Sequence, residues 1–249
     1  GKLVAKWGST GMGDGQFNFP HGIAIDSLGN VYVADTDNHR IQKFTSDGKL
    51  VAKWGSLKGE GELNAPHGIA IDSSDNVYVA DSNNDCIQKF TSDGKFITKW
   101  GSKGSGDGEF LSPSGIAIDS SDNVYVADST NSRIQKFTSD GKFITKWGSK
   151  GSGDGEFSFP SNIVVDSSDN VYIVDTTNSH IQKFTSDGKF ITKWGSKGSG
   201  DGEFLSPKGI AIDSSDNVYV ADASNHRVQV FRVSVSIPAS TAITDESKE

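Results

Sequence analysis

Cysteine is nearly absent from this 249-residue chain, which carries one cysteine, Cys86. A single thiol excludes a disulfide within the chain. Long hydrophobic runs are also missing, and none approaches the ~20 apolar residues that a membrane-spanning helix requires. The 24 Lys and Arg are outnumbered by 32 Asp and Glu, so the formal net charge is −8. This balance argues against nucleic acid as a partner, because its recognition usually needs a basic face.

An internal repeat organises what is present. The five tryptophans fall at nearly constant spacing, at positions 7, 54, 100, 147 and 194. Each unit holds four short segments rich in strand-forming residues, separated by turn formers such as the Asp-Gly of TSDGK. Four antiparallel strands per unit, repeated five times, predict an all-β fold: a β-propeller of five four-stranded blades.

The strands of one unit differ in composition. In the third copy, residues 115–118 and 124–127 are apolar on both faces, which predicts strands buried between neighbouring blades. Residues 134–137 and 142–147 mix apolar and charged side chains, which predicts strands nearer solvent. We expect Lys136, Lys142 and Lys146 to protect the exposed edges against aggregation. We expect the tryptophans to pack between blades.

The phase of the repeat predicts how the ring closes. Residues 2–7 (KLVAKW) correspond to the fourth strand of a blade, but no first three strands precede them in the sequence. Residues 228–232 (VQVFR) correspond to a third strand that no fourth strand follows. Pairing these two segments would close five blades into one domain spanning 1–233, and we expect a monomer. A fragment of a larger ring is the alternative. Residues 234–249 lose the pattern and are predicted to be a C-terminal linker or loose tail.

Three segments of each copy carry a family resemblance. In the first copy, residues 20–26 (PHGIAID), 31–35 (VYVAD) and 38–44 (NHRIQKF) resemble an NHL repeat, and the match recurs through residues 1–232. The resemblance implies a propeller, for which six blades are more usual than five. It specifies function poorly, since NHL-type propellers include protein-binding and RNA-binding modules, bacterial sensor domains and a peptidylglycine lyase on a related fold.

The five copies diverge mainly on one predicted face, which carries the Gly-rich crossings and the loops after the second strands. Two sets of equivalent positions vary there: His21, His67, Ser114, Ser161 and Lys208 after the repeated proline, and His39, Asp85, Ser132, Ser179 and His226 further out. We predict that both sets contact a ligand, because a ring of copies should diverge where it touches something asymmetric. Random drift is the alternative.

His21 and His67 are candidate metal ligands. Both open the innermost strand of adjacent blades, and converging neutral imidazoles can hold Zn²⁺ or Cu²⁺. The related lyase uses similar Pro-His openings to place zinc. The other three blades supply two serines and Lys208, which make a weak ligand set. The alternative is that the two histidines are only polar residues lining a water-filled channel. We expect no other cofactor.

These observations favour a noncatalytic binding or scaffold module whose loop-bearing face contacts a protein, peptide or glycan. The alternative is a metal-dependent lyase- or lactonase-like enzyme with its site at the channel mouth. RNA binding is disfavoured because the chain has four arginines and is acidic. The composition, with a first residue Gly1 that suggests trimming, favours an extracytoplasmic or cell-surface prokaryotic location.

Overall fold

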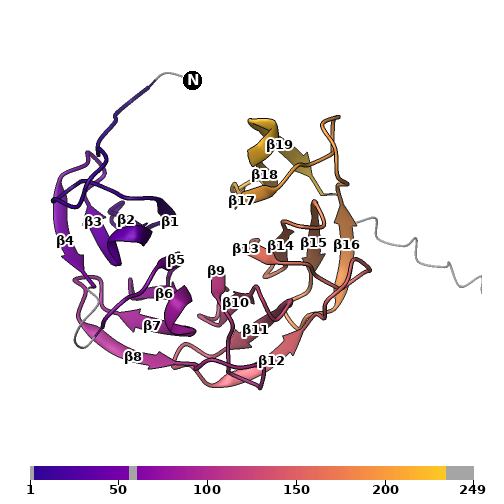
Figure 1. Ribbon diagram of the computed structural model, residues 1–249, viewed down its shortest axis with the longest axis horizontal. Helices are drawn as coiled ribbons and strands as arrows, with labels where there is room; N and C mark the ends of the chain where they lie inside the picture. Colours follow the sequence, from indigo (N-terminus) through magenta and orange to yellow (C-terminus); the bar gives the residue numbers. More distant parts are fainter. Residues whose placement is uncertain (1–2, 56–60, 234–249) are drawn as a thin grey trace, which may run out of the picture.

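The computed structural model describes residues 3–55 and 61–233, and its strands form five antiparallel sheets arranged as an arc (Figure 1). The blades are, in chain order, β1 (Pro20–Ile25), β2 (Val31–Asp35), β3 (Arg40–Phe44) and β4 (Leu50–Trp54); β5 (Pro66–Ile71), β6 (Val77–Asp81), β7 (Cys86–Phe90) and β8 (Phe96–Trp100); β9 (Pro113–Ile118), β10 (Val124–Asp128), β11 (Arg133–Phe137) and β12 (Phe143–Trp147); β13 (Pro160–Val165), β14 (Val171–Asp175), β15 (His180–Phe184) and β16 (Phe190–Trp194); and β17 (Pro207–Ile212), β18 (Asn217–Asp222) and β19 (Arg227–Arg232). Three-residue 3₁₀ turns follow β2, β6 and β18: η1 (Thr36–Asn38), η2 (Ser82–Asn84) and η3 (Ala223–Asn225). The all-β propeller with five blades is therefore confirmed.

Aromatic residues join each blade to the next. The ring of Trp100, at the end of β8, lies 6.2 Å from Tyr78 of its own blade and 5.9 Å from Phe137 of the following blade. Phe110 and Ile116 complete the cluster between the second and third blades. The expectation that the tryptophans pack between blades is confirmed for Trp54, Trp100, Trp147 and Trp194, so the core of this protein lies at the junctions of its repeats.

The prediction that third strands lie nearer solvent is wrong. All five residues of β11 are buried, whereas β12 alternates between half-buried and exposed positions. Lys136 does not protect an edge, because its ammonium lies 3.2 Å from the buried Asp119 carboxylate and 4.7 Å from the centre of the Tyr125 ring. A polar side chain can be buried when it is paired and hydrogen-bonded, and each third strand finds such partners within its own blade.

The predicted closure of the ring is not found among the described residues. Residues 3–9 form no strand, and the last sheet has three strands, β17, β18 and β19. The innermost strands β1 and β17 stand apart at the two ends of the arc (Figure 1). As a result Ile23 is 67% exposed on β1, while its equivalents Ile69 and Ile116 are 7% and 5% exposed.

The residues at the two ends of the arc lack the links that join the other blades. At the other junctions a hydroxyl such as Thr36 donates to the proline carbonyl of the next blade, and a lysine such as Lys43 donates to a turn carbonyl there. The last blade carries Ala223 and Val230 at these two positions. The other blades have an aspartate that accepts hydrogen bonds from a serine of the preceding blade, and the first blade carries Gly29 at this position. A junction of the last blade with the first would lack all three links.

The open arc predicts unequal roles for equivalent tryptophans. The Trp147 ring pairs with Tyr125 on one side and Phe184 on the other, whereas among the described residues the Trp7 ring pairs with Phe44 and is 36% exposed. We expect Trp147→Ala to lower the free energy of unfolding by about 3–5 kcal/mol. Trp7→Ala should cost much less, because less of its surface is buried. Equilibrium urea denaturation of the two variants checks this, and equal losses would show that residue 7 sits in a closed junction.

The proposed linker or tail, residues 234–249, lies outside the described residues, so the domain boundary at 233 stays a prediction. Within 3–55 and 61–233, no helix has the length and apolar character needed to span a bilayer.

Candidate functional site

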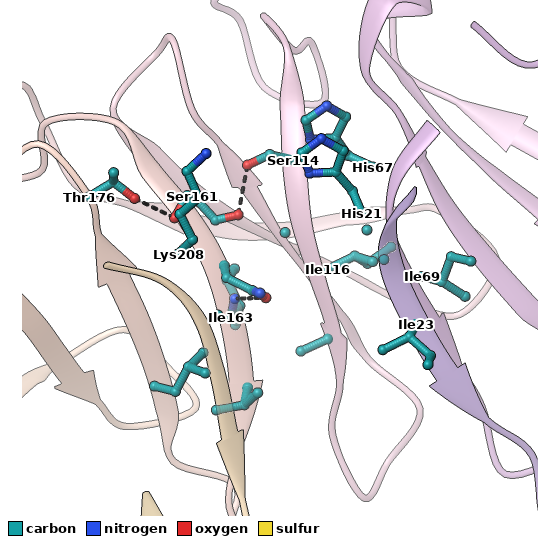
Figure 2. A pocket seen from close by; sticks show the side chains of 18 of the residues that line it. His21, Ile23, His67, Ile69, Ser114, Ile116, Ser161, Ile163, Thr176 and Lys208 are labelled. Atoms are coloured by element: carbon teal, nitrogen blue, oxygen red, sulfur yellow. Dashed lines mark hydrogen bonds between the residues drawn. The ribbon is translucent and has the colours of Figure 1, made fainter. Parts of the chain in front are cut away.

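The five equivalent positions that follow the repeated proline meet at one end of the central channel. Each begins the innermost strand of its blade, and together they line a cavity of about 840 Å³: His21, His67, Ser114, Ser161 and Lys208. Figure 2 shows these polar side chains at one level of the cavity and the isoleucines of the same strands at another. The sequence predicted this grouping from the equivalent position of these residues after the repeated proline.

Hydrogen bonds between blades fix the serine side of this rim. The Ser114 hydroxyl donates to the Ser161 carbonyl at 2.9 Å, and the hydroxyls of Ser161 and Thr176 lie 2.6 Å apart (Figure 2). The wall beyond is apolar, because the fourth residue of every innermost strand is an isoleucine that lines the cavity: Ile23, Ile69, Ile116, Ile163 and Ile210. The cavity therefore combines a polar rim with an apolar wall, as small-ligand sites commonly do.

His21 and His67 stack face to face, with ring centres 4.4 Å apart and an angle of 14° between the planes. The lone pair of an imidazole nitrogen lies in its ring plane. Two nearly parallel stacked rings therefore cannot both reach one ion at the Zn–N distance of about 2 Å. Among the described residues, no group of three or more His, Cys, Asp or Glu could hold a metal ion. The present arrangement does not fit a metal, and the proposed Zn²⁺ or Cu²⁺ site stays a prediction that requires a ring to turn.

The surroundings favour neutral imidazoles. Burial, followed by the proximity of His21 and Lys208, lowers the pKa of His67 to about 4, while Asp37 acts weakly in the opposite direction. Burial and Lys208 also lower the pKa of His21. At neutral pH both rings can therefore donate one hydrogen bond and accept another, and Lys208 carries the positive charge of the rim.

Removing that charge should move both titrations. We expect Lys208→Ala to raise the pKa of His21 and of His67, since each would then be protonated without a neighbouring cation. Lys197→Ala is the matched control, because Lys197 lies on the crossing before the same blade and does not line the cavity. A pH titration of the imidazole NMR signals measures both effects. Unchanged values in the Lys208 variant would place that ammonium away from the two rings.

The second set of predicted ligand positions does not line this cavity. His39 Nδ1 accepts a hydrogen bond from the Ala65 amide at 3.0 Å, and the Asp85 carboxylate accepts one from the Ser112 amide at 2.8 Å. Ser132, Ser179 and His226 occupy the equivalent left-handed positions in the other blades. These contacts give the first two a role in joining blades, and ligand contact by this set stays a prediction.

Sequence reasoning missed a row of hydroxyls behind the rim. The residue after the repeated aspartate of the second strand donates to the proline carbonyl of the next blade, as Thr176 does to Pro207 at 2.8 Å. Ser82 and Thr176 also line the cavity. The available signal was that four copies carry Ser or Thr there, while the last carries Ala223.

The Arg positions on this face are structural. Arg133 Nε donates to the buried Asp128 carboxylate at 2.7 Å. Cys86 replaces that arginine in the second blade, and its sulfur lies 3.9 Å from the Asp81 carboxylate. Burial and the nearby carboxylate raise the pKa of the Cys86 thiol to about 12, so it is a poor nucleophile.

Two family models match the chain. The NHL repeat model matches residues 17–44 and 204–231, and a model described as a 6-bladed beta-propeller matches residues 58–137 and 120–184. The B-box type zinc finger protein ncl-1 of Caenorhabditis elegans is 48% identical over 44 residues, which cover 18% of this chain and 5% of that protein. The human NHL repeat-containing protein 3 is 44% identical over 50 residues, covering 20% and 14%. The chain thus matches only a small part of these relatives.

Solved structures of similar fold include enzymes. A streptogramin B lyase superposes with a TM-score of 0.67 at 16% identity, covering 88% of this chain and 70% of that chain. A gluconolactonase of Xanthomonas campestris superposes with a TM-score of 0.65 at 15% identity, covering 85% and 71%. At these identities the likeness shows the fold alone. Together with the repeated blades, the family matches place this chain in the NHL-repeat β-propeller family.

Proposed function

We propose that this propeller is a noncatalytic binding module whose ligand contacts the channel mouth and the loops around it. A protein, a peptide or a glycan is the expected partner. One observation supports this proposal above all: the five equivalent positions around the cavity carry three residue types, His, Ser and Lys, whereas the turns of the opposite face hardly vary among the copies. Because the rim residues differ between blades of the same fold, the site favours a ligand whose own groups differ from one side to the other.

The scaffold suits such a role. Hydrogen bonds between the blades hold the serine side of the rim, so that side needs little ordering when a ligand arrives, and preorganisation of this kind favours affinity. The same proposal explains why the turns of the opposite face hardly vary among the copies, since that face would contact no specific partner.

A variant with a symmetrised rim tests the proposal. Replacing His21, His67 and Lys208 with serine gives every blade the residue that Ser114 and Ser161 already supply. Peptides selected from a phage-displayed random library, and sugars bound on a glycan array, should bind the natural protein and lose affinity for this variant. Its thermal unfolding should stay close to that of the natural protein. Ligands that bind both proteins equally would contradict a role for the rim.

Metal analysis of the purified protein separates binding from the enzymatic alternative. Stoichiometric zinc or copper that is lost in His67→Ala would favour a metal-dependent lyase or lactonase at the channel mouth. Metal-free protein with rim-dependent ligands would support the binding module.

A further inference from the structure

We propose that the channel mouth binds an organic monocarboxylate with an apolar body, its carboxylate at Lys208 and the adjacent hydroxyls and its body along the channel isoleucines. This inference rests on the proposed function, which it narrows to one ligand chemistry. The carboxylate could belong to a free acid or to the C-terminus of a peptide that ends in an apolar residue.

The charge of the cavity points to an anion. Its lining contains Lys208, His21 and His67 but no Asp or Glu, although acidic residues outnumber basic ones in the chain. No salt bridge joins Lys208 to an acid among the described residues, whereas the four lysines of the third strands each pair with a buried aspartate. Asp37, which influences both imidazoles, lies on η1 and outside the lining. Lys208 is exposed at the rim, so its ammonium is accessible to an anionic ligand.

The polar groups around the rim can bind a carboxylate from two sides. Lys208 on β17 and Ser161 on β13 belong to neighbouring strands, and both line the cavity (Figure 2). The neutral imidazoles of His21 and His67 provide N–H donors at the other end of the arc of strands. One cation with neutral donors suits a single carboxylate better than a phosphate or a dicarboxylate, which would leave charge unpaired.

The apolar wall specifies the rest of the ligand. Five isoleucines line the cavity beyond the rim, one from each blade, and together with Val165 and Ile212 they offer no charged group. A sugar or a strongly polar ligand would lose hydration there without gaining hydrogen bonds. An alkyl or branched apolar body would instead bury its own surface together with that of the wall.

Isothermal titration with hexanoate tests the inference, with hexylammonium and hexanol as probes of matched size. Hexanoate should bind one to one, and the other two should bind at least tenfold more weakly. Lys208→Met should weaken hexanoate binding about 10- to 100-fold, since a hydrogen bond to a charged group is lost. Lys197→Met, which alters a lysine outside the lining, should leave the affinity unchanged.

A second pair of probes separates the two sources of carboxylate. A hexapeptide ending in leucine, with a free C-terminus, should bind more tightly than its C-terminal amide if the natural ligand is a peptide end. If both peptides bind equally weakly while hexanoate binds clearly, the natural ligand is a free acid. Hexylammonium binding as tightly as hexanoate, or hexanoate binding that survives Lys208→Met, would overturn the inference. Rim-dependent peptides or glycans that lack a carboxylate would overturn it while leaving the binding module in place.

Discussion

Replacing Asp128 with alanine should destabilise the protein by about 3–5 kcal/mol, because it breaks a buried ion pair by removing one partner. The Asp128 carboxylate is fully buried and accepts hydrogen bonds from the Leu111 amide, Asn131, Arg133 and Gln135. The variant would leave the Arg133 guanidinium, whose side chain is 7% exposed, without its carboxylate. Chemical denaturation followed by tryptophan fluorescence measures the loss.

The same substitution in the last blade is the matched control. Asp222 is as deeply buried and pairs with Arg227 at 2.8 Å, but the Arg227 side chain is 28% exposed. Water can solvate that guanidinium when the carboxylate is removed, so Asp222→Ala should cost less than Asp128→Ala. Equal losses would mean that burial of the arginine does not determine the effect. A loss below about 1 kcal/mol for Asp128→Ala would place the pair among ordinary surface salt bridges.

Gly115→Ala should also be strongly destabilising, by about 1–3 kcal/mol, because it inserts a methyl group where two blades meet. A Cβ at Gly115 would lie 2.7 Å from the Asn162 Cα and 2.9 Å from the Ser161 carbonyl oxygen. Both are backbone atoms of the next innermost strand, β13, so the contact cannot be relieved by a side-chain rotation. The two blades would have to separate.

Gly209 provides the control for this prediction. It holds the equivalent position on β17, at the open end of the arc, and its nearest neighbour is the Ala221 side chain at 3.3 Å. Gly209→Ala should therefore change the free energy of unfolding by less than Gly115→Ala. Thermal unfolding of the two variants distinguishes them, and a larger loss at Gly209 would indicate that β17 packs against β1 of the first blade.

The blades could be predicted from the sequence because the signals that define them are local. The Asp-Gly of each TSDGK segment makes a tight hairpin turn, as Gly48 shows with φ of +87°. The repeated proline marks the start of each innermost strand. From these fixed points the sequence also places His21, His67 and Lys208 at the same level of the ring.

The burial of the third strands could not be predicted, since it depends on partners distant in the sequence. Gln135 is polar and suggests exposure, yet it is fully buried because its amide donates both to Asp128 and to the Glu109 carbonyl, 26 residues earlier. The open arc could not be predicted for a similar reason, because contacts between residues of different blades set the angle between the blades. Whether two histidines stack or converge likewise depends on that angle.

Methyl NMR during a hexanoate titration tests the central claim, that the channel mouth is the ligand site, most directly. Labelled isoleucine methyl groups report on both surfaces of the ring, since Ile69, Ile116 and Ile163 line the cavity while Ile97 and Ile144 are exposed on outer strands. The account predicts saturable shifts for the first three and none for the last two. Shifts confined to the outer strands, or no shift at any channel isoleucine while hexanoate binds, would contradict it.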